Sequence, residues 1–271
     1  MRGAVALLSE APLDVGGVET HLLALLRGGV EAGYVMRVVA PARPRFVRAA
    51  AGLGVSVNPW HTTGPLDPGA LCNLLALLKA EDIDLLHIHG PRAGVLGRLA
   101  AWWLGIPVLV TVHMPAYHYH AGSGPAARLR RWLYREVERF LNHWLTERLI
   151  YVSSSVHEEA LALGVSPGDR SVVIQNGVNL GAYQDSRPAT AAGEGTSDCS
   201  VTISYVGRLE REKGVDLLLT AMASLRDTGQ GWRLWLIGDG PQRPALEQQA
   251  KALQLDHQVH FLGFRPEVPA I

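Results

Sequence analysis

The sequence predicts an α/β fold built from two successive series of parallel strands and helices. Short apolar runs recur along the chain, and segments with apolar residues at helical spacing separate them. Continuous apolar runs are typical of parallel strands that are covered on both faces. Between Gln184 and Ser200 the composition changes to small, polar and acidic residues without apolar periodicity. This stretch, 184–200, is typical of a linker or a mobile surface loop, and it divides the two series.

The first series occupies residues 1–183 and predicts a doubly wound sheet. Its predicted strands are Gly3–Leu8, Val35–Val39, Asp84–Ile88, Val108–Val112, Leu149–Val152 and Val172–Gln175. Its predicted helices are Glu19–Leu26, Pro68–Lys79, Arg92–Leu104, Ala126–Leu145 and His157–Leu163. The regular alternation of the two kinds of segment supplies the crossover connections that parallel strands require.

The second series occupies residues 201–271 and predicts only part of a second domain. Strand-like runs lie at Ser200–Val206, Trp232–Ile237 and Val259–Leu262, and helical segments lie at Val215–Leu225 and Pro244–Leu255. About three strands are therefore expected in the second sheet.

The composition narrows the classes of protein to which the chain can belong. With 271 residues, 48% of them hydrophobic, the chain can bury the core of one large or two ordinary domains. Lys plus Arg equals Asp plus Glu at 25 each, so no overall basic field favours nucleic acid as a partner. Cys72 and Cys199 are far apart, which is typical of free thiols in a reducing compartment. Since Ala4–Leu8 is too short for a secretory signal, we expect a cytoplasmic protein.

The most informative segment is a glycine-flanked loop between an apolar strand and a helix. It carries two cations, Arg208 and Lys213, at the carboxyl end of a predicted parallel strand. Open α/β sheets bind ligands at this end, and a helix amino terminus attracts anions, so the loop is a candidate diphosphate site. The alternative interpretation is a solvated charged turn in which Glu210 and Glu212 neutralise their neighbours.

Further motifs accompany this loop along the chain. They are Gly16–Glu19, Thr111–His113, Val152–Ser155, Val173–Asn179, Leu236–Pro241 and Val259–Gly263. Together with Gly207–Asp216 they resemble the family 4 glycosyltransferases, which are retaining enzymes that use nucleotide sugars and have the GT-B fold. The resemblance spans essentially the whole chain. It implies two Rossmann-like doubly wound domains that face a cleft, of which the second is incomplete here.

The resemblance also implies a function. A sugar would move from a nucleotide-sugar donor to an acceptor hydroxyl with retention of configuration, in polysaccharide or glycolipid biosynthesis. Arg208 and Lys213 would hold the donor diphosphate and neutralise the leaving group, so no metal or other cofactor is expected. His113 would contact the transferred sugar or stabilise the transition state.

Other matched positions are candidate substrate contacts. The backbone amides of Gly16 and Gly17 would complete an anion site ahead of a helix, or would simply form a turn. Glu19 would line the site or favour the helix dipole. Asn176 is a candidate donor contact, although shaping the turn also explains it. Gly238 and Gly240 form a tight turn near the expected nucleotide base. At these two glycines the turn alone is a sufficient explanation.

The resemblance implies, finally, that this chain is a shortened member of the family. Related chains continue beyond the position of Ile271 and include two glutamates that contact the donor. A non-catalytic fragment or binding module is therefore one alternative function. A sugar-nucleotide epimerase of the same architecture is another, although such enzymes do not ordinarily carry the Arg-to-Lys loop.

Two more patterns remain open. His87 and His89 would share one face of a strand, and His118 and His120 follow the same spacing, but no third ligand is evident, so no metal site is predicted. Residues 128–135 mix arginines with Trp, Leu and Tyr at helical spacing. This segment would suit a peripheral contact with the anionic inner face of a membrane and hence a lipid-linked acceptor, or the ordinary packing of a surface helix.

Overall fold

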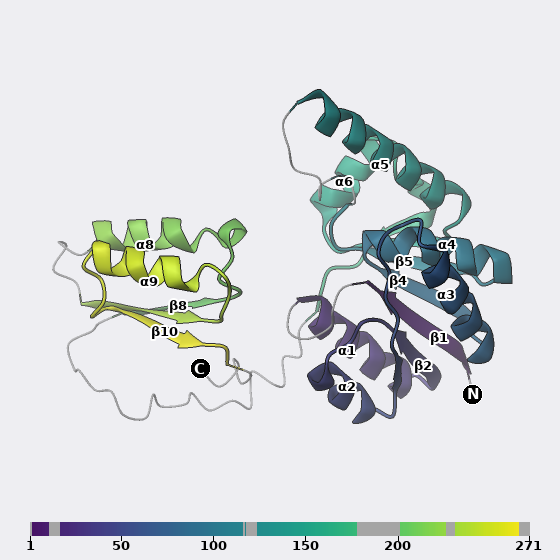
Figure 1. The fold of residues 1–271 in the computed structure, drawn as a ribbon, viewed down its shortest axis with the longest axis horizontal. Helices are drawn as coiled ribbons and strands as arrows, with labels where there is room; N and C mark the ends of the chain where they lie inside the picture. Colours follow the sequence, from purple (N-terminus) through teal and green to yellow (C-terminus); the bar gives the residue numbers. More distant parts are fainter. Residues whose placement is uncertain are drawn as a thin grey trace. The chain divides into compact units, whose positions relative to one another are not determined.

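The computed structural model describes residues 2–10, 17–115, 117, 124–177, 201–225 and 231–265, which form two compact units (Figure 1). The units are Met1–Gly177 and Val178–Ile271. The predicted linker, 184–200, lies outside the described residues, so the predicted boundaries at 183 and 201 stay a prediction.

Unit 1 contains a seven-stranded sheet in the order β3-β2-β1-β4-β5-β6-β7. The strands are β1 Arg2–Ser9, β2 Tyr34–Val39, β3 Ser56–Asn58, β4 Leu85–His89, β5 Val108–Val112, β6 Arg148–Tyr151 and β7 Ser171–Val173. All of their pairings are parallel. The strand order reverses between β1 and β4, which confirms the doubly wound sheet.

Helices cover both faces of this sheet (Figure 1). They are α1 Gly17–Glu31, α2 Pro44–Ala51, α3 Pro68–Ala80, α4 Pro91–Leu104, α5 Pro125–Trp144 and α6 Ser154–Ala162. Successive residues of β1 point to opposite faces, so Leu7 packs with Leu22 of α1 while Leu8 packs with Leu74 of α3. The two buried faces explain why this strand reads as a continuous apolar run.

Helix α4 lies close to the two strands at the reversal. A Cβ atom on Gly97 would lie 2.6 Å from Leu8 Cδ2 and 2.7 Å from Ile88 Cδ1. Real Cβ atoms essentially never approach so closely, so the absence of a side chain permits this packing. The contact fixes the helix that begins at the carboxyl end of β4.

A buried arginine joins α4 to the end of α5. Arg98 Nε donates to Thr146 Oγ1 at 2.8 Å, and Nη2 donates to Asn142 Oδ1 at 2.6 Å. Its Nη1 donates to the carbonyl of Gly94 at 3.0 Å. Burial lowers the pKa of Arg98 to about 10. All three guanidinium nitrogens therefore donate to neutral oxygens. These hydrogen bonds hold the buried cation, and none of the three acceptors is a carboxylate.

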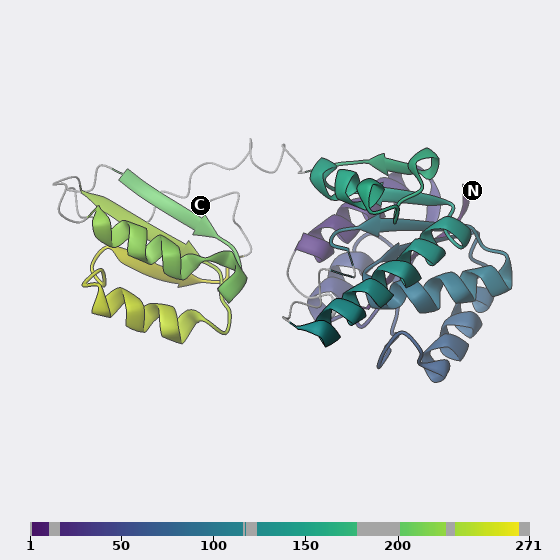
Figure 2. The same ribbon diagram turned by 90° about the horizontal axis from the view of Figure 1, so that it is seen from above.

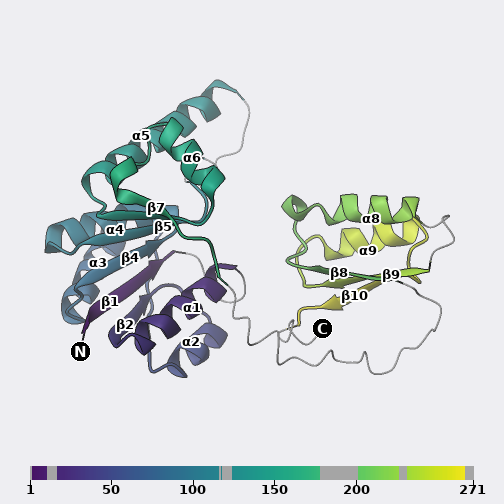
Figure 3. The same cartoon turned by 180° about the vertical axis from the view of Figure 1, so that it is seen from behind.

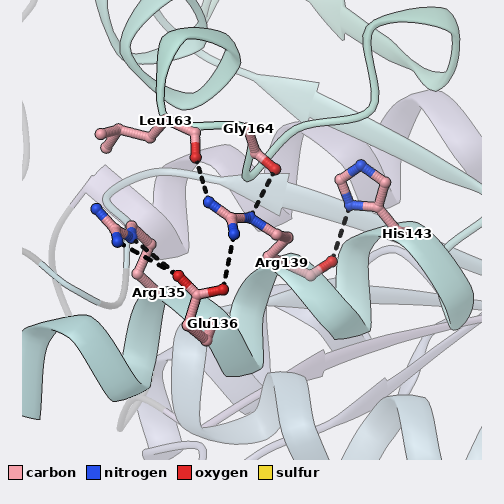
Figure 4. A network of polar contacts seen from close by, with 6 residues as sticks. All are labelled: Arg135, Glu136, Arg139, His143, Leu163 and Gly164. Carbon is pink, nitrogen blue, oxygen red and sulfur yellow. Dashed lines mark hydrogen bonds and ion pairs between the residues drawn. The ribbon is translucent and has the colours of Figure 1, made fainter.

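A second arginine joins α5 to the end of α6 (Figure 4). Arg139 donates to the carbonyl of Leu163 at 2.6 Å and to that of Gly164 at 3.0 Å, which satisfies carbonyls at the end of α6. Glu136 accepts from Arg139 Nη1 at 2.7 Å and also pairs with Arg135 at 3.3 Å. One side of α5 is thus fixed to the unit by polar contacts.

Unit 2 contains a smaller parallel sheet of three strands in the order β10-β9-β8. Its elements are β8 Val201–Val206, the 3₁₀ turn η3 Arg211–Lys213, α8 Val215–Ser224, β9 Trp232–Ile237, α9 Arg243–Ala252 and β10 Val259–Gly263. Figures 2 and 3 show α8 and α9 on one face of the sheet. Leu219 and Leu246 of these helices pack on Leu234 and Leu236. The described part of unit 2 is therefore half of a doubly wound domain, in agreement with the predicted partial domain.

The described residues contain no helix that combines the length and the apolar character needed to cross a membrane.

Candidate functional site

The carboxyl ends of β1 and β4 mark the first candidate site, in unit 1. These adjacent strands are where the strand order reverses, and doubly wound sheets bind ligands in the crevice at that point. His89 is the last residue of β4, and His113 directly follows β5, the next strand. The sheet therefore brings these two side chains to the same edge.

A third histidine joins them from α1. The ring centroid of His21 lies 4.9 Å from that of His113 and 5.4 Å from that of His89. His89 Nδ1 and His113 Nε2 are 3.3 Å apart and share a hydrogen bond. We call these three residues the histidine cluster. Three segments that are distant in the sequence thus converge on one point.

Burial holds the cluster in its uncharged form. It lowers the pKa of His113 to about 4, with a smaller contribution from the nearby His21. The same cause takes the pKa of His89 well below its usual range. Burial also lowers the pKa of His21, partly offset by a hydrogen bond with the side chain of Asn176. Near pH 7 the three rings are therefore neutral, and each offers one donor nitrogen and one acceptor nitrogen.

His87 lies behind the cluster. Its ring centroid is 4.3 Å from that of His89, which confirms that the two share one face of the strand. Its Nε2 and Thr111 Oγ1 share a hydrogen bond of 2.8 Å, so this imidazole is engaged away from the cluster. The other predicted pair, His118 and His120, lies outside the described residues. His21 is the partner that sequence reasoning missed.

Glu10, which follows β1, also lies at this edge. Its Oε2 accepts from the backbone nitrogen of Ala93 at 2.9 Å, in the first turn of α4. A carboxylate is favourable there because the first turn has free N–H groups and a positive dipole end. Gly90 has φ +110, and a Cβ on it would lie 2.4 Å from Glu10 Oε2. Sequence reasoning missed this interaction, although the glycine before Pro91 marks the start of the helix.

The structure places the remaining predicted residues of unit 1 as follows. Gly16 lies outside the described residues. Gly17 is the first residue of α1, and Glu19 is buried in its first turn. Asn176 lies in the segment after β7, and its side chain reaches His21. Asn176 and His113, predicted from separate motifs, therefore both lie next to His21, and their contacts with a substrate stay predictions.

The second candidate site is the loop that follows β8 in unit 2. Arg208 is 60% exposed and forms an ion pair of 2.9 Å with Glu210, as the alternative interpretation of a charged turn predicted. Lys213 is exposed at the end of η3. Gly214 adopts a left-handed conformation with φ +63 and begins α8. Both cations therefore lie ahead of the amino terminus of a helix, and the exposed ion pair contributes only about 0.2–1 kcal/mol, so an anion can replace it.

The backbone of this loop is packed on the turn between β9 and α9. The backbone nitrogen of Leu209 donates to the carbonyl of Asp239 at 3.0 Å. A Cβ on Gly238 would lie 1.9 Å from the carbonyl oxygen of Gly207, and one on Gly240 would lie 2.5 Å from that of Leu209. Both predicted glycines are thus required by packing. A contact of either with a nucleotide stays a prediction.

Comparison with known families identifies the chain. The family described as Glycosyltransferase Family 4 matches residues 15–182, and the family described as Glycosyl transferases group 1 matches residues 188–271. The first match covers more than half of the chain. The chain therefore belongs to glycosyltransferase family 4, as the motifs indicated.

Named relatives agree with this assignment. The chain is 27% identical over 251 residues to 2-deoxystreptamine glucosyltransferase of Streptomyces kanamyceticus, covering 88% of this chain and 62% of that one. It is 30% identical over 189 residues to glycogen synthase of Mycobacterium tuberculosis, covering 66% and 41%. It is 27% identical to D-inositol 3-phosphate glycosyltransferase of Saccharomonospora viridis, covering 89% and 60%. The chain thus spans less than two thirds of the length of these relatives.

Solved structures show the same fold. Anabaena Alr3699/HepE in complex with UDP and glucose superposes with a TM-score of 0.76 at 18% identity, covering 99% of this chain and 71% of that one. WaaG, a glycosyltransferase involved in lipopolysaccharide biosynthesis, superposes with a TM-score of 0.70 at 16% identity, covering 98% and 71%. The fold is accordingly GT-B, with a partial second domain.

Proposed function

We propose that this chain takes part in glycosyl transfer from a nucleotide sugar to an acceptor hydroxyl, with retention of configuration. The observation that carries the proposal is the pair of exposed cations, Arg208 and Lys213, on the loop that follows β8 and is hydrogen-bonded to the turn after β9. The named complexes of Alr3699/HepE with UDP and with UDP-glucose support a nucleotide-sugar donor.

In this proposal the loop stabilises the leaving diphosphate. The planar fork of Arg208 would bind two phosphate oxygens, and Lys213 would add a point charge. The free N–H groups at the start of α8 would face the same anion. Each hydrogen bond to a charged group contributes about 1.5–3 kcal/mol. Because these groups neutralise the charge that develops, the transfer requires no metal.

Unit 1 would contact the sugar and the acceptor. The neutral ring of His113 can donate one hydrogen bond and accept another, which suits a sugar hydroxyl. Asn176 would add an amide contact, and Gly16, Gly17 and Glu19 would lie along the same edge of the sheet. Gly238 and Gly240 would lie near the nucleotide base. Polysaccharide or glycolipid assembly is the setting that we propose for the reaction.

The test measures donor binding by the 271-residue chain. Thermal melts with UDP-, GDP- and ADP-sugars should show a rise in Tm with one nucleotide series, because a ligand that binds the native state stabilises it. Arg208→Ala should weaken that binding by about tenfold or more, which corresponds to the loss of about 1.4 kcal/mol or more. Arg211→Ala is the matched control, because Arg211 is an exposed cation of the same loop. Equal losses in both variants, or no response to any donor, would contradict the proposal.

Product analysis separates the alternative functions. Transfer of labelled sugar to an acceptor supports the enzyme. Donor binding without turnover supports the binding module, and release of an epimerised nucleotide sugar supports the epimerase. Transfer and epimerisation leave different labelled products, whereas the binding module leaves the labelled donor unchanged, so one assay with labelled donor distinguishes all three.

We also propose that α5 contacts the anionic inner face of a membrane, so that the acceptor is lipid-linked and the protein is cytoplasmic and peripheral. One side of α5 carries an apolar stripe that is 40–75% exposed. Its members are Leu129, Leu133, Val137, Phe140 and Trp144. The exposed Arg128 and Arg130 lie on the same helix and complement anionic lipid. Exposed apolar side chains next to arginines favour a membrane surface.

Vesicle co-sedimentation tests this second proposal. The chain should bind vesicles that contain phosphatidylglycerol, and the binding should weaken as salt increases. Leu133→Ser should reduce binding, whereas Leu66→Ser should not, because Leu66 is an exposed apolar residue outside the stripe. Equal binding to purely neutral vesicles, or the same loss in both variants, would contradict it.

A further inference from the structure

A groove lies at the edge of the first sheet that is opposite to the histidine cluster. Trp102, in the last turn of α4, and Trp144, the last residue of α5, both line it. Its volume of about 360 Å³ is within the range of about 300–1,000 Å³ that is usual for small-molecule sites. Val108, the first residue of β5, also lines the groove, whereas His113 follows the last residue of that strand. At about 3.3 Å per residue the groove is roughly 16 Å from the backbone of His113, so it is a separate place on unit 1.

The two tryptophans present their indole rings to solvent. Trp102 is 64% exposed and Trp144 is 75% exposed, although tryptophan is highly buried on average. An exposed indole offers a ligand both a flat apolar face and a donor N–H. The groove therefore has two aromatic surfaces on which a ligand can pack.

The floor of the groove is held by polar contacts. Arg170 donates to the carbonyl of Thr146 at 3.1 Å and to that of His143 at 2.8 Å. The backbone nitrogen of Glu147 donates to the carbonyl of Val108 at 2.9 Å. These bonds join the connection after α5 to the start of β5. The two tryptophans thus border a fixed backbone.

The charges of the lining favour a neutral ligand. Among the described residues, the groove is lined by one carboxylate, that of the exposed Glu147, and by one guanidinium, that of Arg170. Their formal charges cancel, so neither an anion nor a cation meets a net opposite charge. An anionic lipid surface is attracted instead by clustered cations, and acyl chains require a continuously apolar lining. The groove has neither of these features.

A saccharide matches this combination of groups. The ring of a pyranose has an apolar face of C–H groups, which can pack on an indole, and a rim of hydroxyls. A hydroxyl can donate to the carboxylate of Glu147 and accept from an indole N–H. Small-molecule sites commonly combine aromatic packing with a few polar groups in this way.

We propose that this groove is a second saccharide-binding site, which holds a neutral glycan chain away from the transfer site. The inference deepens the proposed function and rests on it for the source of the glycan, a growing acceptor. A chain that is held at the groove and is long enough to reach the transfer site would have a raised effective concentration there. Trp144 also belongs to the exposed stripe of α5, so Trp102, which lies on α4, distinguishes this site from the membrane surface.

Calorimetry of the full chain with neutral oligosaccharides tests the inference. The probes are maltohexaose, cellohexaose and mannohexaose, each added without a nucleotide-sugar donor. At least one should bind with saturation. Trp102→Ala should weaken that binding by about tenfold or more, because truncation of a tryptophan that anchors a ligand is among the most costly substitutions in a binding site.

Trp103→Ala is the matched control. Trp103 is its neighbour on α4 and is 74% exposed, but it does not line the groove, so the affinity for the glycan should be unchanged. A thermal melt verifies that each variant is folded. The inference is overturned if none of the three glycans binds, or if folded Trp102→Ala and Trp103→Ala bind the glycan equally. It is also overturned if Trp102→Ala loses vesicle binding and keeps glycan binding, because the groove would then be part of a membrane surface.

Donor binding is measured separately, so the two proposals can fail independently. If the chain binds a glycan through Trp102 but no nucleotide sugar, the proposed function fails and the saccharide site is supported. If it binds a nucleotide sugar and none of the glycans, only the saccharide site fails. Arg208→Ala should bind the glycan as tightly as the parent, because Arg208 lies in unit 2.

Discussion

The two units organise their candidate sites in opposite ways. In unit 1 the side chains are preorganised: His89 is 1% exposed, and its neighbours His21 and His113 limit the movement of its ring. In unit 2 the backbone is preorganised: the carbonyls of Gly207 and Leu209 lie on the turn that contains Gly238 and Gly240. There the cationic side chain of Arg208 is 60% exposed.

The difference teaches where each unit is sensitive to substitution. Removing a buried polar side chain leaves its partners unsatisfied inside a core, so unit 1 loses stability together with its site. Removing an exposed cation leaves no buried group unpaired, so unit 2 loses a ligand contact while its fold persists. In unit 2 the sensitive positions are Gly238 and Gly240. The backbone of the neighbouring loop occupies the space that a side chain at either position would need.

Gly238→Ala should produce the largest effect and tests the backbone half of this comparison. The residue has φ +141, and its added Cβ would lie 1.9 Å from the carbonyl oxygen of Gly207. Strain and overpacking of this kind cost about 1–3 kcal/mol each, so the free energy of unfolding of unit 2 should fall by about 4 kcal/mol. Urea denaturation with hydrogen exchange of peptides from 201–225 measures the loss in that unit.

Gly214→Ala is the matched control for this substitution. Gly214 also has a positive φ, +63, but its added Cβ would meet only Leu217 Cδ1, at 3.8 Å. The left-handed conformation alone costs about 1–2 kcal/mol. If both variants lose the same free energy of unfolding, the left-handed backbone conformation of the glycines, and not the close approach of the loop, determines the sensitivity of unit 2.

Arg98→Leu should have the next largest effect and tests the side-chain half. It removes the buried donor shared by Thr146 Oγ1 and Asn142 Oδ1. We expect unit 1 to lose about 3 kcal/mol, since hydrogen bonds from a charged group contribute about 1.5–3 kcal/mol each and a leucine restores part of the packing. Arg208→Ala is the comparison and should change stability by about 0.5 kcal/mol or less. The comparison between the units is contradicted if Arg98→Leu and Arg208→Ala lower the free energy of unfolding by the same amount in urea denaturation.

The smallest effect concerns alkaline pH. Burial raises the pKa of Tyr151 to about 12, whereas an unfolded tyrosine ionises near its ordinary value of about 10. Between these values the unfolded chain releases a proton that the folded chain keeps, so stability falls as the pH rises from 10 to 12. The total is about 2 kcal/mol. The difference between the parent and Tyr151→Phe, measured by urea denaturation at several pH values, isolates this tyrosine from other groups. A difference that is independent of pH would contradict the prediction.

The main elements of the fold follow from the sequence because each buries an apolar face. The segments missed were α2, Pro44–Ala51, and β3, Ser56–Asn58. In α2 only Phe46 and Ala50 are buried, and β3 is a short strand at the edge of the sheet with no fully buried residue. Both elements are short, with eight and three residues, so each contains too few repeats of its period to be recognised from the sequence alone.

The candidate sites were predictable where a motif contains the chemistry. Arg208, Lys213 and His113 were predicted as site residues because each lies in a motif that follows a recognisable strand, and their roles stay predictions. The position of His21 beside His89 and His113 depends instead on the strand order, which sets α1 beside the ends of β4 and β5. A local pattern does not specify that order. For the same reason the bond from the backbone of Ala93 to Glu10 joins positions 83 residues apart and had no local signal.

The central pairing of the first sheet also has a consequence for synthesis. Val5 of β1 pairs with Leu85 of β4, a separation of 80 residues. At a translation rate of roughly 5–20 residues per second, the ribosome makes the partner strand roughly 4–16 s after the first strand. Until then β1 can gain a partner on one side only, once β2 has been made, and its other edge stays open to neighbouring nascent chains. Chaperones that cover this edge until His89 emerges should therefore raise the yield of folded protein.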